Sequence, residues 1–295
     1  MPRMQIDFYS KRLCSNTAMT VIFPQGTPDM LSGGIRYNAR GKIPVLWLLH
    51  GLGDDHTSWT RYTRLERYAL ARGIAVVCPA VLNLCMYHNM AGGNPYFDFI
   101  AYELPQILGE MFPQFSTERE DNYIAGLSMG GYGALRFGLT FPERYGAIGV
   151  FSSGNLIEFD AIFRPEDYQQ EWMRPFANMA KNTFGVQSMN ELTGTDADVY
   201  TLYKRARAAG KPLPRICLYC GDEDFVKPLS DQLARFLQRQ DPEGEVLYGT
   251  GPGAHNWDFW DQWLPAFLEA CGLTPLVQAA QISEVKRPAA PCGEQ

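Results

Sequence analysis

The sequence predicts an α/β protein with a mostly parallel, doubly wound β-sheet and helices on both faces. Three observations predict this fold class: two β-like stretches open the chain, short apolar runs then alternate with helical patterns up to residue 270, and 46% of the 295 residues are hydrophobic. Strands that alternate with helices form parallel pairs. A chain near 300 residues can bury about 75% of the surface of its unfolded form, so we expect one large core.

The elements of the first half are defined by apolar periodicity. Strands are predicted at Met4–Tyr9, Thr17–Phe23, Ile43–Leu49 and Ile74–Cys78. Helices are predicted at Ser58–Ala71 and Phe97–Phe112. Gly73 follows the first helix as a stop signal, and the second keeps its apolar stripe despite Pro105.

The second half continues the alternation. Strands are predicted at Asn122–Ala125, Ala147–Phe151, Ile216–Cys220 and Glu245–Tyr248, and helices at Gly131–Leu139, Leu229–Gln240 and Trp257–Ala270. Between about residues 155 and 210 the pattern fails and aromatic and charged residues mix, which predicts a lid-like insertion in a single domain of residues 1–277. Residues 278–295 are polar, small and proline-bearing, which predicts a flexible tail.

Composition and charge exclude several classes of function. The chain has 26 basic and 32 acidic residues, a net charge of −6, and no run of like charges, so nucleic acid is not an expected partner. The amino terminus has no apolar stretch as long as a signal peptide or a membrane span, so we expect a cytoplasmic protein without a membrane partner. The seven scattered cysteines are interpreted as free thiols. Cys217 and Cys220 form a C-x-x-C within a predicted strand, where residues three apart point to opposite faces.

A glycine-flanked serine marks the candidate nucleophile. Gly126 to Gly130 reads Gly-Leu-Ser-Met-Gly, which matches G-x-S-x-G, with a predicted strand before it and a predicted helix after it. That is the context of a nucleophile elbow, a sharp turn that presents the serine at the top of a sheet in the α/β-hydrolase fold. The motif therefore predicts this fold, with Ser128 as the nucleophile.

A serine hydroxyl needs a base, and the base needs an orienting acid. In this fold the chain order is serine, acid, histidine, and His255 is the one histidine of the four that follows Ser128. The acid is expected just after the strand at 216–220, where Asp222, Glu223 and Asp224 are consecutive. We favour Asp224, keep Asp222 as the alternative, and expect Glu223 to be solvated.

Acyl transfer also needs backbone N–H groups that stabilise the developing oxyanion. One donor is expected at Met129, the residue after the nucleophile. The second is expected at Leu52, in the loop that follows the strand at 43–49. His50 precedes this loop and is interpreted as structural.

Several motifs together resemble a known family. They are Leu-Leu-His-Gly-Leu-Gly-Asp-Asp-His-Thr-Ser-Trp at 48–59, Leu-Glu-Arg-Tyr-Ala at 65–69, Glu-Leu-Pro at 103–105, the elbow extended to Ala134, and Cys-Gly-Asp-Glu-Asp-Phe at 220–225. Over residues 5–272 the chain resembles the tributyrin-esterase branch of the esterase D group, which includes S-formylglutathione hydrolases and is related to feruloyl esterases and mycolyltransferases. The resemblance implies an α/β-hydrolase fold, ester hydrolysis without a cofactor, catalytic roles for Ser128, Asp224 and His255, and oxyanion donors at Leu52 and Met129. Residues 155–210 and the tail match no motif of the family.

The function hypothesis is a serine carboxylesterase that hydrolyses short-chain acyl, aryl or sugar esters through a covalent acyl-serine intermediate. Acyl transfer and S-formylglutathione-type thioester hydrolysis are alternatives on the same residues, and a non-catalytic binding protein is the third. Substrate contacts are predicted at Tyr87, His88, Trp172 and Trp257. No metal is expected, because a metal site needs closely spaced His, Cys or carboxylate ligands. Asp54-Asp55-His56 is the one cluster of this kind in the sequence, and we do not favour it as a metal site. The expected partner is a small ester, and the sequence leaves a homo-oligomer open.

Overall fold

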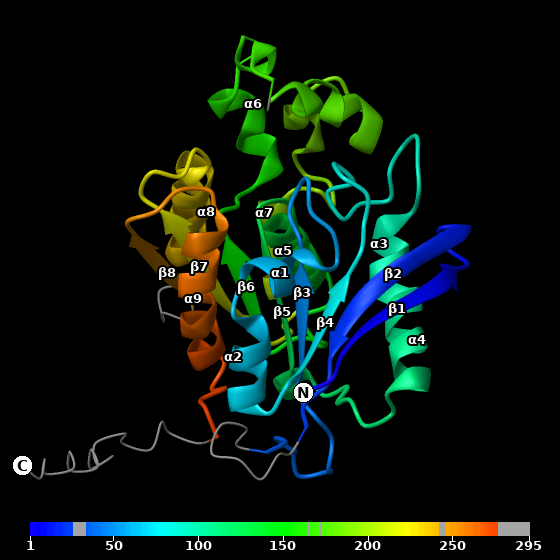
Figure 1. Ribbon diagram of the computed structural model, residues 1–295. Helices are drawn as coiled ribbons and strands as arrows, with labels where there is room; N and C mark the ends of the chain where they lie inside the picture. Colours follow the sequence, from blue (N-terminus) through cyan, green and yellow to red (C-terminus); the bar gives the residue numbers. More distant parts are fainter. Residues whose placement is uncertain (26–33, 165, 172, 242–245, 277–295) are drawn as a thin grey trace, which may run out of the picture.

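The eight-stranded sheet that organises the chain has the predicted α/β architecture (Figure 1). The computed structural model describes residues 1–25, 34–164, 166–171, 173–241 and 246–276. The strands are β1 (Arg3–Ser10), β2 (Ser15–Ile22), β3 (Val45–Leu49), β4 (Ala75–Pro79), β5 (Asn122–Leu127), β6 (Ala147–Phe151), β7 (Arg215–Gly221) and β8 (Val246–Gly251). Their order is β1-β2-β4-β3-β5-β6-β7-β8. The pairs β1–β2 and β2–β4 are antiparallel, and the remaining pairs are parallel.

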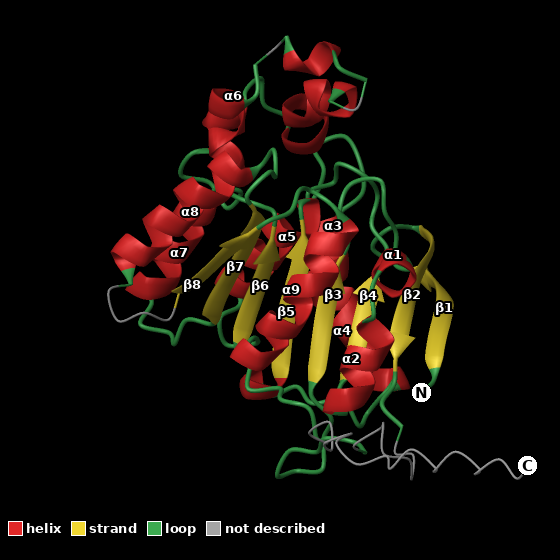
Figure 2. Cartoon of the chain, turned by 60° about the vertical axis from the view of Figure 1, so that its left-hand side comes forward, coloured by secondary structure: helices red, strands yellow, loops and turns green. Residues whose placement is uncertain are grey.

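The central strands are apolar because both of their faces are covered. Every residue of β3, β4, β5 and β6 is buried. Helices α1 (Ser58–Tyr62), α2 (Leu65–Arg72) and α9 (Trp257–Ala270) pack on one face (Figure 2). Helices α4 (Leu104–Met111), α5 (Met129–Thr140), α7 (Val199–Ala208) and α8 (Lys227–Gln240) pack on the other. Cys217 belongs to the first core and Cys220 to the second, so these thiols point to opposite faces as predicted.

Two predicted helices differ from the observed ones. The prediction of one helix at Ser58–Ala71 was wrong, because α1 and α2 are separated at Thr63, whose backbone is extended. The backbone N–H and the Nε of Arg64 both donate to Asp261, each at 2.8 Å, and hold the break. Phe97–Phe112 is helical but not uniform: α3 (Tyr96–Asp98), a π-helical turn at Phe99–Glu103, and α4 follow one another. Pro105 has no N–H for the Ala101 carbonyl, which accepts from Arg144 Nη1 at 2.7 Å instead.

Residues 155–198, here called the insertion, lie beyond the carboxyl ends of the parallel strands (Figure 1). The insertion consists of short turns: 3₁₀ helices at Leu156–Glu158, Asp167–Gln169, Arg174–Asn178 and Met189–Leu192, α6 (Phe159–Ile162), and a π-helical turn at Ala180–Phe184. Asn155 Nδ2 donates to Asp198 Oδ1 at 2.8 Å and joins its two ends. The last part of the predicted 155–210 segment is α7, which packs against α5.

Part of the predicted organisation lies outside the described residues, namely the tail at 278–295 and the start of the strand predicted from Glu245. Among the described helices, none combines the length and the apolar character that crossing a membrane requires.

Candidate active site

Ser128 lies at the turn between β5 and α5 with φ 51° and ψ −118°, a strained backbone conformation for a residue with a side chain. Two close backbone approaches explain the flanking glycines. A Cβ at Gly126 would lie 2.3 Å from the Gly130 carbonyl oxygen, and a Cβ at Gly130 would lie 2.4 Å from the Leu49 carbonyl oxygen. The motif residues therefore build the turn that exposes Ser128 above the sheet.

His255 and Asp224 are in direct contact although 31 residues separate them. His255 Nδ1 lies 3.0 Å from Oδ1 and 3.1 Å from Oδ2 of Asp224. Asp224 follows β7 and is 4% exposed, whereas Asp222 is exposed to solvent. Of the two carboxylates that the sequence left open, the structure thus brings Asp224 to the imidazole. The Glu223 carboxylate is exposed but also accepts from the Gly253 N–H at 2.6 Å.

A hydrogen-bond chain fixes the Asp224 carboxylate. It accepts from the Val226 N–H at 2.9 Å and from the Ser152 hydroxyl, and Ser152 Oγ accepts from Trp260 Nε1 at 2.9 Å. Burial alone would raise the pKa of Asp224, but the hydrogen bonds and the neighbouring His255 outweigh it and lower this pKa below its ordinary value. Asp224 is therefore an anion at neutral pH that orients the imidazole.

The loop after β3 is held by His50. Its Nδ1 donates to the Gly51 carbonyl at 2.8 Å, and its Nε2 accepts from the Val81 N–H at 3.1 Å, so the ring is the neutral tautomer with the proton on Nδ1. This bond fixes the orientation of the peptide between Gly51 and Leu52. His50 has the structural contacts expected of it.

Asp54 also contributes to this loop, which the sequence did not indicate. A Cβ at Gly51 would lie 3.5 Å from Asp54 Oδ2 and 3.4 Å from Ser128 Cβ, so both Asp54 and Ser128 lie beside Gly51. Burial raises the pKa of Asp54, while hydrogen bonds from the Ser58 hydroxyl and the Gly51 N–H oppose this effect. Asp54 therefore closes the turn that carries Leu52.

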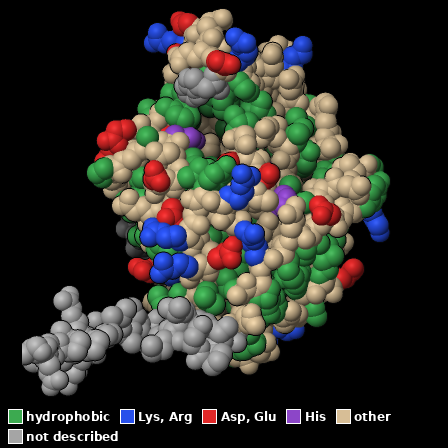
Figure 3. All heavy atoms as spheres, in the orientation of Figure 1, with side chains coloured by type: hydrophobic (Ala, Val, Ile, Leu, Met, Phe, Trp, Pro, Cys, Tyr) green, Lys and Arg blue, Asp and Glu red, His purple; other side chains and the backbone are tan. Residues whose placement is uncertain are grey.

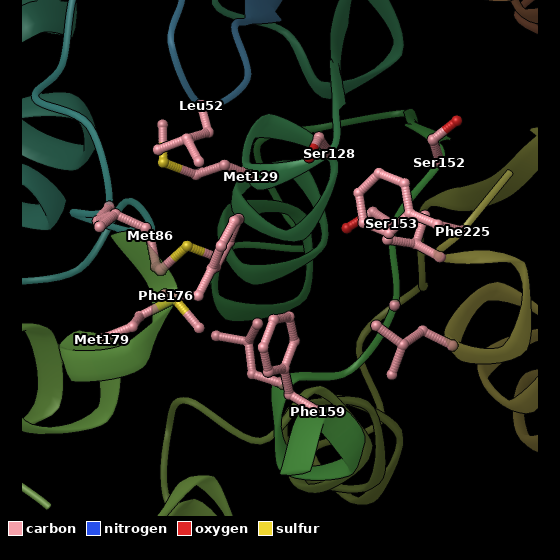
Figure 4. Close-up of a pocket in the computed structure, with 15 residues that line it drawn as sticks. Leu52, Met86, Ser128, Met129, Ser152, Ser153, Phe159, Phe176, Met179 and Phe225 are labelled. Atoms are coloured by element: carbon pink, nitrogen blue, oxygen red, sulfur yellow. The ribbon is translucent and has the colours of Figure 1, made fainter. Parts of the chain in front are cut away.

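An apolar cavity of about 50 Å³ opens beside Ser128 (Figure 4). Leu52 and Met129 line it, as expected for residues next to the reacting group. The remaining lining residues come from the segment after β4, from the end of β6, from the insertion and from the start of α8: Leu84, Met86, Ser152, Ser153, Gly154, Leu156, Phe159, Phe176, Met179, Phe225, Val226 and Leu229. Figure 3 shows hydrophobic side chains gathered below the insertion on this face, next to a histidine.

Phe225 connects the cavity to the imidazole. It lines the cavity together with Ser128, and its ring centroid lies 4.5 Å from that of His255. Trp260 contacts the imidazole edge-on, at a centroid distance of 5.1 Å. The two aromatic rings restrict the positions that the imidazole can take near the elbow.

Three of the predicted substrate contacts do not line the cavity. Tyr87 is fully buried because its hydroxyl donates to the His50 carbonyl at 2.9 Å, and its neighbours Leu84 and Met86 line the cavity instead. His88 packs against Phe184, and its Nδ1 donates to the carbonyl of the next residue at 2.8 Å.

Trp257 lies on the face of the sheet that α1, α2 and α9 cover, where it packs against Trp59 and Trp260 at centroid distances of 5.2 and 5.1 Å. Trp172, the fourth predicted contact, lies outside the described residues. The aromatic residues of the insertion that do line the cavity are Phe159 and Phe176.

The comparisons with known proteins agree with this geometry. Residues 32–270 match the family model Esterase, described as "Putative esterase". The chain belongs to this esterase family. An acetyl esterase of Caldicellulosiruptor saccharolyticus is 32% identical over 271 residues, covering 91% of this chain and 97% of its own.

Two solved structures from Staphylococcus aureus are similar throughout. The fluorophosphonate-binding serine hydrolase FphF has a TM-score of 0.76, with 28% identity over 92% of this chain and 98% of its own. The S-formylglutathione hydrolase FrmB has a TM-score of 0.71, with 28% identity over 92% and 99%. The predicted α/β-hydrolase fold and the resemblance to the esterase D group are confirmed, and the esterase is a carboxylic ester hydrolase.

The side chains of Asp54, Asp55 and His56 in the esterase are not grouped around a common point. His56 Nδ1 bonds to Thr20 Oγ1 at 2.8 Å, and Asp55 Oδ1 accepts from the N–H and the hydroxyl of Thr57 at 2.7 and 2.6 Å. Within the described ranges, no three His, Cys, Asp or Glu side chains are grouped to hold a metal ion.

We expect the esterase to lose stability on acidification between pH 7 and pH 5. Burial lowers the pKa of His50, His56 and His88, whereas an imidazole in the unfolded chain titrates near pH 6.5. In this window the unfolded chain binds more protons than the folded protein does. The free energy of unfolding is therefore highest above about pH 6.5 and falls as the pH drops toward the lowered pKa values of the folded protein. Urea unfolding at pH 7.5, 6.5 and 5.5 measures the effect.

The variant His50→Asn tests the assignment, because it removes one of the buried imidazoles. It should be less stable at pH 7.5 but lose less further stability at pH 5.5 than the unmodified protein does. An equal loss in both proteins would contradict the role given to His50.

Proposed function

We propose that the esterase hydrolyses short-chain carboxylic esters through an acyl-Ser128 intermediate. The observation that carries the proposal is the Asp224–His255 contact, which Phe225 joins to the apolar cavity that Ser128 lines at its strained turn. The similarity to a serine hydrolase that binds fluorophosphonates supports Ser128 as the acylated residue.

The proposed reaction assigns each of these residues a role. Ser128 Oγ attacks the ester carbonyl carbon while His255 Nε2 takes the hydroxyl proton, and Asp224 stabilises the resulting imidazolium. The N–H groups of Leu52 and Met129 donate to the oxyanion. The carbon–oxygen bond of the leaving alcohol then breaks as His255 returns the proton to it. Water repeats the sequence on the acyl-enzyme, releases the acid and restores Ser128.

The size and polarity of the cavity support a short acyl group. A water-sized group occupies about 10–15 Å³ of such a volume, so about 50 Å³ accommodates about three to five groups. Acetyl to butyryl chains fit this range. A formyl group would leave most of the apolar lining without contact, which favours acyl esters over a formyl thioester. The acetyl esterase among the relatives supports the same preference.

We further propose that the insertion acts as a lid that limits chain length. Phe176 and Met179 are the residues of its central turns that line the cavity. Replacing Met179 by alanine should enlarge the cavity and lower the butyrate-to-octanoate ratio of kcat/KM about tenfold, since each methylene is worth roughly 1–3 kcal/mol in such a pocket. A p-nitrophenyl ester series from acetate to octanoate measures this ratio.

Met173→Ala is the matched control. Met173 also belongs to the insertion and is 1% exposed, but it does not line the cavity. It should lower stability without changing the chain-length ratio. The same change of ratio in both variants, or in neither, would contradict the proposed role of the lid.

A further inference from the structure

A second concave surface, here called the basal groove, lies at the end of the sheet opposite Ser128. It has a volume of about 660 Å³ and includes Val45 and Asn122, the first residues of β3 and β5. Ser128 follows the last residue of β5, so the length of this strand, roughly 20 Å at ~3.3 Å per residue, separates the two sites. Small-molecule sites typically occupy about 300–1,000 Å³, so the basal groove is large enough for a ligand of its own.

Aromatic side chains with fixed positions line the groove. Trp47 is 8% exposed, and its Nε1 donates to Asn122 Oδ1 at 3.2 Å. Phe112 and Phe115 stack on each other with a centroid distance of 4.8 Å and an interplanar angle of 9°. All four residues line the groove. Flat rigid rings favour a flat apolar ligand, because little side-chain entropy is lost on binding.

Tyr145 provides a polar group that lacks a partner. It lines the groove and is 5% exposed, and its hydroxyl makes no hydrogen bond to any residue in the part of the chain that the structure describes. Burial raises its pKa to about 12, so the hydroxyl is a neutral donor at physiological pH. The hydroxyl is not among the buried polar atoms that lack a partner, so it is accessible from the groove, where an acceptor on a ligand would bond to it.

The charged residues of the groove favour an anion. Arg40, Lys42 and Arg144 line it together with one carboxylate, that of Glu118. Arg40 pairs with Glu118 at 2.7 Å, which leaves the other two cations without a counter-charge among the lining residues. Lys42 Nζ donates to the carbonyl oxygen of residue 113 at 2.6 Å, which is a neutral partner. Arg144 Nη1 donates to the carbonyl oxygen of residue 101 at 2.7 Å, and its charge also interacts with the Glu143 carboxylate, which does not line the groove.

We propose that the basal groove binds a small aromatic carboxylate, with its ring against Trp47 and Phe112 and its carboxylate facing the Tyr145 hydroxyl, Lys42 and Arg144. The proposal does not depend on the reaction at Ser128. It combines three independent features of the groove, namely its flat apolar walls, its unpartnered donor and its excess of positive charge.

The test uses 1-naphthoate as the probe and the full-length esterase with Ser128 blocked by a fluorophosphonate. Isothermal titration calorimetry should show one bound naphthoate per chain, and at least tenfold weaker binding of the neutral analogue 1-naphthamide. Loss of naphthoate binding when Ser128 is blocked would assign the probe to the catalytic cavity and overturn the proposal. So would a complete absence of binding at millimolar concentration.

Gly109→Leu provides the decisive variant. Gly109 lies in α4 and lines the groove, and a Cβ there would meet no atom within 4 Å, so the new side chain fills the groove without a clash. Leucine also favours the helix over glycine, so the variant should fold. Its affinity for naphthoate should fall at least tenfold, and Tyr145→Phe should lower it about tenfold through the lost hydrogen bond to the charged group.

Glu110→Leu is the control on the same helix. Glu110 is exposed and does not line the groove, so its replacement should leave naphthoate affinity and ester turnover unchanged. Equal affinity in Gly109→Leu and the unmodified protein would overturn the proposal. A second copy of the chain in the groove would also overturn the proposal. In that case light scattering would show a dimer, Gly109→Leu would dissociate it, and naphthoate would fail to bind.

Discussion

The Ser128→Ala variant should lose ester hydrolysis by about 10⁴- to 10⁶-fold while it remains folded, because the reaction has no other nucleophile at the elbow. The substitution removes one oxygen atom and keeps the Cβ, so the strained turn at φ 51° is preserved. Turnover of p-nitrophenyl acetate measures the loss, and circular dichroism and the melting temperature report on the fold.

Ser153→Ala is the matched control, since Ser153 is another of the three serines that line the cavity. Ser153 also lines the cavity and is 7% exposed, but it lies after β6 and outside the glycine-flanked turn. A fluorophosphonate probe should label Ser153→Ala covalently and should fail to label Ser128→Ala. Labelling of Ser128→Ala, or unchanged turnover in it, would remove Ser128 from the mechanism.

The second large effect is expected for Asp224→Asn, which should lower kcat by about 10⁴-fold. The carboxylate accepts hydrogen bonds from the Val226 N–H and the Ser152 hydroxyl. These donors would hold the carbonyl oxygen of an asparagine, so that its amide group would face His255 Nδ1. The imidazole would then carry its proton on Nε2, and this tautomer cannot accept the proton of Ser128.

Asp222→Asn is the matched control, since it changes the exposed carboxylate two residues earlier in the chain. It should keep turnover within about threefold of the unmodified value, as surface substitutions usually do. The opposite result, with Asp222→Asn inactive and Asp224→Asn active, would require a different arrangement of the loop after β7.

Local sequence signals were sufficient for the sheet and for naming the side chains of the candidate site. Each central strand is a continuous apolar run because both of its faces are covered, and the close approaches at Gly126 and Gly130 admit no other residue type. Chain order alone selected His255. The choice between Asp222 and Asp224 needed the three-dimensional path of the loop, since both follow the same strand.

Distant partners explain what the sequence could not predict. The helix break at Thr63 and Arg64 depends on Asp261, which lies nearly two hundred residues further along the chain. Tyr87 was predicted as a substrate contact, but its hydroxyl donates to the His50 carbonyl and the residue is buried. Leu84 and Met86 reach the cavity through backbone conformations with φ 60° and 47°, which apolar side chains rarely adopt and no pattern indicates.

The positions of Cys217 and Cys220 have a consequence for the response of the esterase to oxidants. Three residues of extended strand separate their Cα atoms by about 10 Å, whereas a disulfide requires less than about 7 Å. The two sulfur atoms also project into cores on opposite sides of the sheet. Oxidising conditions therefore cannot cross-link this pair without unfolding the centre of the molecule, and the C-x-x-C has no route to act as a dithiol switch.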